Sequence, residues 1–245
     1  MKLNRKHSGK PVYRMHQAGK VLPLVLIAVA AMVVGAATFS LLSDQPSVEE
    51  SAAQSSSNAD NTELAALQEN LQTSLAFPSD FRSIPEFDLL DVNSQSITQD
   101  VFDDQWSLVF FGFTHCPDVC PITLQLMKNV VASVEEQGQQ TPQIVFVSID
   151  PARDTADVLK KYIGYFSDDF VGITGDVNDI HEFSRSLGIV ASFTANETDP
   201  DRYGVDHTAS LLLVDPQGRV RAKITPPHEA PTIVADYLTI LSAPS

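Results

Sequence analysis

Cysteine is scarce in this 245-residue sequence, which has only two, together with one tryptophan and four methionines. Two cysteines are too few for a fold stapled by disulfides, and too few for a zinc or iron–sulfur site with four thiolates. Basic residues are also few: 16 Lys and Arg stand against 31 Asp and Glu, for a net charge of -15. Because nucleic-acid binding calls for a basic patch, this acidic balance argues against nucleic acid as a partner. The 43% of hydrophobic residues excludes a wholly disordered chain.

The start of the chain is basic and is followed by a long uncharged run. No acidic residue occurs before Asp44, residues 1–20 carry six basic residues, and residues 21–42 carry no charge. A helix of that length spans about 33 Å, enough for the roughly 30 Å hydrocarbon core of a bilayer. We therefore predict a cytoplasmic segment at 1–20, a single-pass inner-membrane anchor at 21–42 and a periplasmic remainder. The alternative is a cleaved signal peptide, whose apolar region is usually about 7–15 residues.

Residues 43–76 are predicted to form a linker or stalk. Up to about residue 61 they are rich in Ser, Ala, Gln and acidic residues, without apolar periodicity. Leu64, Leu67, Leu71 and Leu75 then recur at helical spacing, which is typical of a short amphipathic helix or a solvated stalk.

Residues 77–245 are predicted to form one globular domain. Continuous apolar runs alternate in it with amphipathic patterns, and a hairpin and a closing helix follow. The expected strands are 107–114, 143–150, 170–174, 209–215 and 219–224, and the expected helices are 121–137, 154–166, 177–187 and 231–241. This order indicates an α/β fold with a mixed central sheet flanked by helices.

Cys116 and Cys120 lie where the strand 107–114 passes into the helix 121–137. Free N–H groups and the helix dipole lower thiol pKa values at such a position. One helical turn separates the thiols, so they can act as a dithiol, a disulfide or two ligands of one metal. An inert disulfide is the simplest alternative, but closing so short a loop stabilises a fold little. Two soft thiolates in a chain with few other ligands suit Cu(I), which accepts two or three ligands.

A third ligand would come from the histidines beyond the anchor, which are His115, His181, His207 and His228. We expect His115 to point away from a site shared with Cys120, His181 to be solvated or to cap its helix, and His228 to lie in a loop. His207 precedes the strand 209–215, which is expected to run beside the strand that leads to the cysteines. Position alone leaves His207 open as a ligand or as a hydrogen-bonded loop residue.

Four separated blocks stand out in the sequence: FFGFTHCPDVCPITL (110–124), VSIDPARDT (147–155), GITG (172–175) and YGVDHTASLLLVDPQG (203–218). Together they resemble the SCO/SenC family of copper-binding cytochrome oxidase assembly proteins. The resemblance extends over residues 81–237. It implies a thioredoxin-like fold, an N-terminal membrane anchor and a copper site formed by two cysteines and a distal histidine. By motif, the implied ligands are Cys116, Cys120 and His207.

Four other polar residues near these motifs have simpler interpretations. Asp118 is expected to bond backbone N–H groups of the turn between the cysteines. Asp150, Arg153 and Asp154 are interpreted as helix capping plus one ion pair, and a partner-facing charge cluster is the alternative. The early block PEFDLLDVNSQSIT departs from the family, because its turn near residues 93–95 lacks the usual glycine.

The resemblance implies a membrane-anchored, periplasmic copper metallochaperone that binds Cu(I) or Cu(II) and helps assemble the binuclear copper centre of cytochrome c oxidase. Its implied partners are the copper-accepting oxidase subunit, an upstream copper donor and the membrane. One alternative is a thiol–disulfide reductase, an enzyme that uses Cys116 and Cys120 as its redox pair to keep the acceptor cysteines reduced. The other is a copper or redox sensor. A peroxiredoxin-like peroxidase is less well supported, because no resolving arrangement or peroxide-binding residues are evident.

Overall fold

The computed structural model describes residues 61–196 and 203–243. The predicted cytoplasmic segment and transmembrane anchor at 1–42 lie outside these residues. In the described part of the chain, no helix combines the length and the apolar content that crossing a bilayer requires. Residues 61–69 are helical, where the leucine spacing predicts a short helix.

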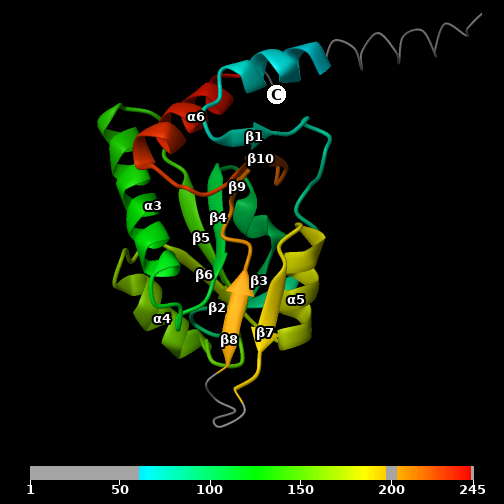
Figure 1. The fold of residues 1–245 in the computed structure, drawn as a ribbon, viewed down its shortest axis with the longest axis vertical. Coiled ribbons are helices and arrows are strands. Elements are labelled where there is room, and N and C mark those ends of the chain that lie inside the picture. The colour runs from blue at the N-terminus through cyan, green and yellow to red at the C-terminus, as the bar shows by residue number, and fades with distance from the viewer. Residues whose placement is uncertain (1–60, 197–202, 244–245) are drawn as a thin grey trace, which may run out of the picture. The chain divides into compact units, whose positions relative to one another are not determined.

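An eight-stranded mixed sheet forms the centre of the fold (Figure 1). Its order is β1-β10-β9-β4-β5-β6-β2-β3, with β4, β5 and β6 parallel and the other pairs antiparallel. The strands are Ser74–Ala76 (β1), Asp88–Asp91 (β2), Ser96–Thr98 (β3), Ser107–Gly112 (β4), Gln143–Ser148 (β5), Val171–Thr174 (β6), Leu211–Val214 (β9) and Val220–Ile224 (β10). A separate hairpin pairs Ala191–Thr194 (β7) with Gly204–His207 (β8).

Three helices connect strands, a fourth follows the last strand, and together they cover the two faces of the sheet (Figure 1). They are Val119–Glu136 (α3), Ala156–Gly164 (α4), Val177–Ser186 (α5) and Ala230–Ser242 (α6), with a short 3-10 helix at Gln99–Phe102 (η1). All four α-helices were predicted to within two residues at each end. Gly188 adopts a φ of +74° just after α5, as expected for a glycine that ends a helix.

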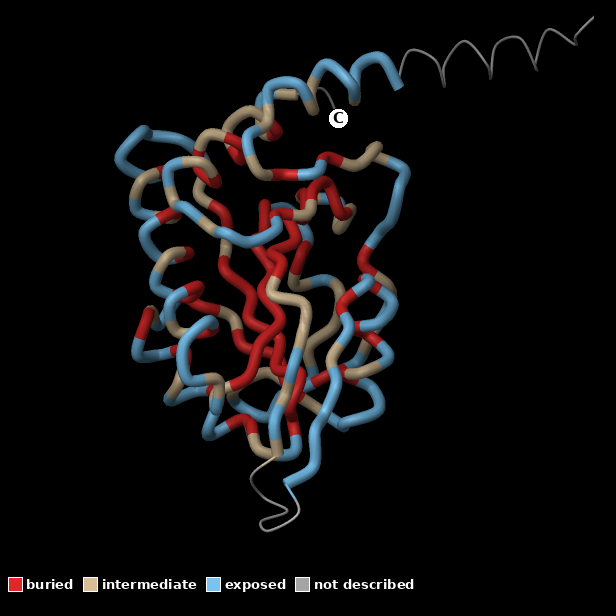
Figure 2. The backbone as a smooth tube through the Cα atoms, in the orientation of Figure 1, coloured by how far each residue is buried: buried red, intermediate tan, exposed pale blue. Residues whose placement is uncertain are grey.

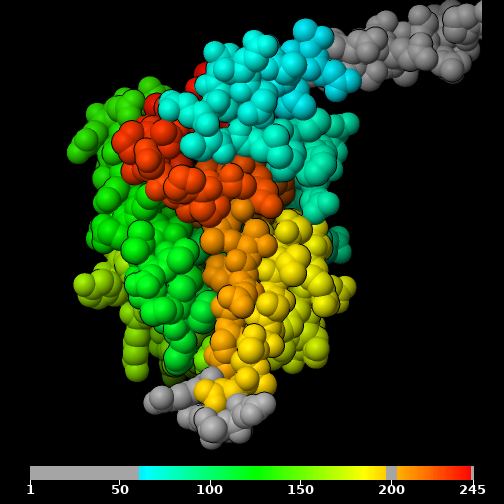
Figure 3. Space-filling view, in the orientation of Figure 1, coloured from blue at the N-terminus to red at the C-terminus, as the bar shows by residue number. Residues whose placement is uncertain are grey.

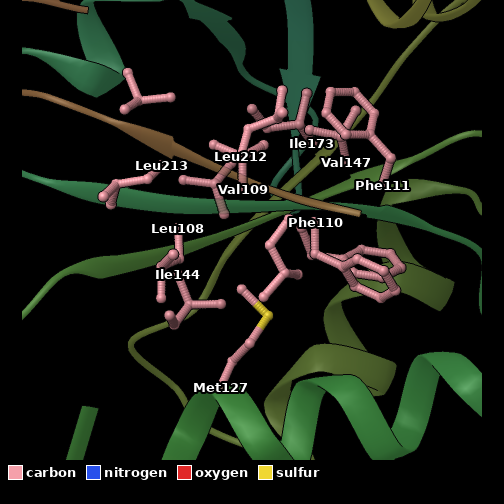
Figure 4. Close-up of a cluster of buried hydrophobic side chains, with 14 of the residues drawn as sticks. Leu108, Val109, Phe110, Phe111, Met127, Ile144, Val147, Ile173, Leu212 and Leu213 are labelled. Atoms are coloured by element: carbon pink, nitrogen blue, oxygen red, sulfur yellow. The ribbon is translucent and has the colours of Figure 1, made fainter. Parts of the chain in front are cut away.

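β4 is buried along its whole length, which explains its continuous apolar sequence. Successive side chains point to opposite faces, so Leu108 and Phe110 lie on the same side as Met127 of α3, whereas Val109 and Phe111 lie on the other (Figure 4). Phe111 contacts Phe183 of α5, with ring centroids 6.0 Å apart. Buried residues therefore concentrate in the central strands, between the two helical layers (Figure 2).

The sheet begins before residue 77, where the sequence places the start of the globular domain. β1 pairs antiparallel with β10, and Ser74 and Ala76 are buried. Three residues are too short a strand to show an alternating pattern, and this one follows a helical leucine spacing. The sequence signal for β1 is therefore hidden within the predicted stalk.

The β2–β3 hairpin forms without the glycine that its turn was expected to need. Ser94 takes the left-handed conformation there, with a φ of +60°. The Asp91 carboxylate accepts hydrogen bonds from the N–H groups of Asn93 and Gln95, both at 2.8 Å. An Asx-type turn thus supplies the stabilisation that a glycine would otherwise provide through its conformational freedom.

Candidate metal centre

The two cysteines lie at the junction of β4 and α3, after a strand that is buried at every residue. Cys116 lies in the connecting loop and Cys120 in the first turn of α3, and both thiols are free. The N–H of Cys120 donates to the sulfur of Cys116 at 3.4 Å. Gly112 makes room for them, because a Cβ at that position would lie 3.0 Å from Cys120 Sγ and 2.8 Å from the ring of Phe146. The thiols are therefore adjacent on one side of the helix start, as the spacing predicts.

The two thiols differ in their exposure to solvent. Cys116 is half-buried, whereas Cys120 is completely buried. Burial raises the pKa of the Cys120 thiol, although a hydrogen bond with the backbone of Phe113 favours its thiolate. The expected lowering of thiol pKa values at the helix start is therefore wrong for Cys120, because loss of solvation outweighs the interactions that favour the thiolate.

His207, the last residue of β8, lies against Cys120. Its Nε2 atom is 3.8 Å from Cys120 Sγ, and its Nδ1 atom is 3.1 Å from the carbonyl oxygen of Thr208. Because a carbonyl only accepts hydrogen bonds, Nδ1 carries the proton and Nε2 presents its lone pair to the sulfur. Burial lowers the pKa of His207, which favours the neutral imidazole. The ring packs edge-on against Phe113, with centroids 5.8 Å apart.

The other three candidate histidines have different contacts. His115 Nδ1 is 3.7 Å from the carboxylate of Asp154, and 52% of its side chain is exposed. His181 Nε2 lies 3.3 Å from the carbonyl oxygen of Ile149, so the expectation that it is solvated or capping its helix is wrong. His228 Nε2 lies 2.8 Å from the carbonyl oxygen of Ala209. Of the four candidates, His207 is the one that the fold brings to Cys120.

The donor atoms near the loop are two sulfurs and one imidazole nitrogen, a set that favours soft metals such as copper. Within residues 61–196 and 203–243, no three His, Cys, Asp or Glu side chains converge closely enough to form a ready-made metal site. A metal held by both cysteines and His207 therefore requires their side chains to draw together.

Asp118 is the N-cap residue of α3, but its side chain makes no capping hydrogen bond.

The loop after β5 supports the cysteine loop through Asp154. This buried carboxylate accepts hydrogen bonds from the N–H and hydroxyl of Thr114, at 2.9 and 2.6 Å, and from the hydroxyl of Ser148, at 2.7 Å. Asp154 and Thr155 are both residue types that cap helices, and the structure confirms Thr155 as the N-cap of α4, where it accepts from the N–H of Val158; the prediction is wrong for Asp154. The motif DPARDT is the sequence signal of this support, but local spacing cannot show that its partner lies 40 residues away.

Comparison with known proteins gives a family match over most of the described domain. The family model described as SCO1/SenC matches residues 78–242. A putative copper-binding protein from Stutzerimonas stutzeri is 38% identical over 146 residues, which are 60% of this chain and 71% of that protein. The mitochondrial SCO2 homolog of Bos taurus is 37% identical over 134 residues, which are 54% of this chain and 50% of the homolog. The matched region therefore spans only about half of the mitochondrial protein.

Solved structures show the same fold. Bradyrhizobium japonicum ScoI with copper bound is 29% identical with a TM-score of 0.57, and the match covers 66% of this chain and 100% of that one. Arabidopsis thaliana ScoI with copper bound is 26% identical with a TM-score of 0.62, and the match covers 65% and 98%. The expected thioredoxin-like fold, a mixed sheet flanked by helices, is confirmed for the described domain.

Proposed function

Because the chain belongs to the SCO1/SenC family, we propose that it carries copper and delivers it to the copper-accepting subunit of cytochrome c oxidase. The proposed ligands are Cys116, Cys120 and His207. The observation that carries this proposal is the contact of His207 Nε2 with Cys120 Sγ, beside the second cysteine of a chain that has only two. Support also comes from a relative named as copper-binding and from similar structures solved with copper.

Each ligand contributes a different property to copper binding. Two thiolates satisfy Cu(I), whereas Cu(II) favours an added nitrogen ligand such as His207. Cys120 must release its proton when it binds the metal, because burial favours the neutral thiol. The half-buried Cys116 is the point at which a thiolate of a donor or acceptor protein can reach the copper. Copper then passes by ligand exchange, without the dismantling of a closed cage.

The proposed location is the periplasmic face of the inner membrane. Residues 21–42 would anchor the chain, and the segment that follows would link the anchor to the domain, whose sheet begins with Ser74 of β1. The basic residues before the uncharged run support this orientation. A reporter that is active only after export, fused behind Ser57, should give signal while the protein stays in the membrane fraction. Release of the mature domain in soluble form would contradict the anchor.

A thiol–disulfide reductase is the second candidate function. The specific observation in its favour is the pair of adjacent free thiols at the strand–helix junction of a thioredoxin-like fold. Thiol exchange begins with attack by a thiolate, and its rate follows thiolate fraction and access. Cys116 is the more accessible thiol, so it would attack first and Cys120 would resolve the mixed disulfide.

The variant His207→Ala separates the two functions, because both need the cysteines and only copper delivery needs the imidazole. We expect it to reduce a disulfide in an acceptor peptide within about tenfold of the parent rate, a barrier change of roughly 1.4 kcal/mol. We also expect it to fail to load copper into the same peptide supplied reduced. The matched control is His181→Ala, which should keep both activities. Normal loading by His207→Ala, with oxidase assembly in cells depending only on the cysteines, would favour the reductase.

A further inference from the structure

The strand that carries His207 has few attachments to the rest of the domain. Among the described strands, β8 pairs only with β7, and the residues of this hairpin are exposed or half-buried (Figure 2). In Figure 3 the orange β8 segment lies beside the green surface that includes α3. Near His207, the N–H of Thr208 donates to the carbonyl oxygen of Val190 at 3.0 Å. At the other end of β8, the strand is preceded by Tyr203.

Tyr203 is held at three points by the loop that follows β5. Its hydroxyl donates a short hydrogen bond to the carboxylate of Asp150. Its carbonyl oxygen accepts from Arg153 Nη1 at 3.3 Å, and its ring lies 3.8 Å from the guanidinium carbon of Arg153. Arg153 Nε in turn donates to Asp150 at 2.6 Å. We call Asp150, Arg153 and Tyr203 the tyrosine clamp.

Asp150 is buried, so its carboxylate depends on these contacts for its hydrogen bonds. Only 1% of its surface is exposed, so its charge is stabilised by Arg153 and by the hydroxyl of Tyr203 rather than by water. The planar guanidinium bonds Asp150 through one nitrogen and stacks on the Tyr203 ring at the same time, which a lysine could not do. The ion pair expected from the sequence is present, but it also fixes a tyrosine 50 residues away.

The same loop supports both halves of the candidate metal centre. Asp154 holds Thr114, which lies two residues before Cys116, whereas Asp150 and Arg153 hold Tyr203, which lies four residues before His207. A single short segment therefore contacts both the cysteine loop and the residue that precedes β8.

We propose that the tyrosine clamp is a positioning device that fixes β8 so that the imidazole of His207 lies against Cys120. The proposal rests on the function above, in which His207 is a copper ligand. Replacing a group that orients a metal ligand without touching the metal typically lowers the affinity of the protein for that metal by about 10–100-fold. Since Cu(I) is satisfied by two thiolates, loss of the clamp weakens Cu(II) binding far more than Cu(I) binding.

The test compares clamp variants of the full chain in their Cu(II) and Cu(I) affinities and in the nitrogen hyperfine coupling of bound Cu(II). Tyr203→Ala removes the hydroxyl and the ring, and we expect Cu(II) affinity to fall by about tenfold or more, with weaker nitrogen coupling. Tyr203→Phe keeps the ring over Arg153, so its Cu(II) affinity should fall less than that of Tyr203→Ala. The matched control is Tyr165→Ala, which removes a tyrosine that is 83% exposed and should bind Cu(II) like the parent.

Amide hydrogen exchange of the copper-free protein tests the clamp without any metal. In Tyr203→Ala the amides of β7 and β8 should exchange faster, while those of β4 stay protected and show that the fold is intact. If the β4 amides of Tyr203→Ala also lose protection, the same comparison is made with Tyr203→Phe. In that variant the amides of β7 and β8 should exchange faster than in the parent but more slowly than in Tyr203→Ala. Unchanged exchange in the hairpin, or parent-like Cu(II) affinity and coupling in a folded Tyr203→Ala, overturns the proposal.

The two proposals fail in different ways. If His207→Ala keeps the Cu(II) spectrum of the parent, the ligand assignment is wrong, and hairpin exchange alone then decides whether the clamp positions β8. If His207→Ala loses the nitrogen coupling while Tyr203→Ala keeps it, His207 remains a ligand and the clamp is overturned.

Discussion

Gly112 shows how one residue allows the cysteines to pack at the end of β4. Cys120 is buried against this strand, and the ring of Phe146 occupies the neighbouring space. An added Cβ would lie 2.8 Å from the ring and 3.0 Å from Cys120 Sγ, closer than such atoms pack. The glycine is therefore needed for close approach, since its φ is not in the left-handed region.

We predict that Gly112→Ala lowers the free energy of unfolding by about 1–3 kcal/mol, because the buried Phe146 and Cys120 must shift to admit the methyl group. Displacement of Cys120 should also weaken copper binding. Chemical denaturation and copper titration measure the two effects. The matched control is Gly164→Ala in α4, where the nearest atom to the new Cβ lies at 3.8 Å. That variant should be neutral or stabilising, and an equal loss in both variants would contradict the packing argument.

At this scale the sequence predicts the site through motif and not through geometry. The spacing of Cys116 and Cys120 predicts that the two residues lie close together, and the structure places Cys116 Sγ 3.4 Å from the backbone nitrogen of Cys120, although Cys116 precedes α3. His207 lies 87 residues from Cys120, so no local pattern links them. The protonation of Cys120 was also beyond sequence reasoning, because it depends on burial by residues from several elements.

Among the secondary-structure elements, α6 holds the segment that leads into β1. Asp236 of α6 is buried and accepts hydrogen bonds from the N–H groups of Gln72, Thr73 and Ser74, at 2.7, 2.9 and 2.8 Å. The hydroxyl of Ser74 donates a further bond at 2.7 Å. Burial alone would raise the pKa of Asp236, but these hydrogen bonds outweigh it and hold the pKa below the ordinary value.

Replacing Asp236 should cost stability in a pH-dependent way. At pH 7, Asp236→Asn should lower the free energy of unfolding by about 1–3 kcal/mol, because an amide cannot replace a charged acceptor of several N–H groups. Since the folded-state pKa is lowered, the carboxylate stabilises the fold fully above the unfolded-state pKa of about 4. The difference between parent and variant should therefore shrink as the pH falls below that value.

Denaturation curves from pH 7 down to pH 3 measure this difference, and Asp169→Asn, which changes an exposed aspartate, is the control. The account of Asp236 is wrong if its replacement costs the same at every pH, or no more than replacement of Asp169.

The elements that the sequence predicts include those that bury a long apolar pattern, such as β4, α3 and β5. The β7–β8 hairpin was missed because its residues are mostly exposed and its strands pair only with each other in the described fold. β1 was missed because its buried residues depend on β10 and Asp236, far along the chain. Pairings of this kind depend on tertiary contacts that no short window of sequence contains.

For the molecule as a whole, the central claim is that one thioredoxin-like domain assembles a copper site from distant parts of its chain. The loop after β4 supplies Cys116, α3 supplies Cys120 and β8 supplies His207. The loop after β5 contacts both the cysteine loop and the residue that precedes β8. Because burial favours the neutral thiol of Cys120, this thiol must lose its proton to become a ligand, so copper loading is coupled to proton release.

X-ray absorption at the copper edge tests this claim most directly, on the purified full chain loaded with Cu(II) and with Cu(I). For Cu(II) we predict two sulfur neighbours and a histidine nitrogen in the parent, with loss of that nitrogen in His207→Ala and its retention in His181→Ala. Copper without sulfur neighbours in the parent, or an unchanged histidine nitrogen signal in His207→Ala, would contradict the proposed site.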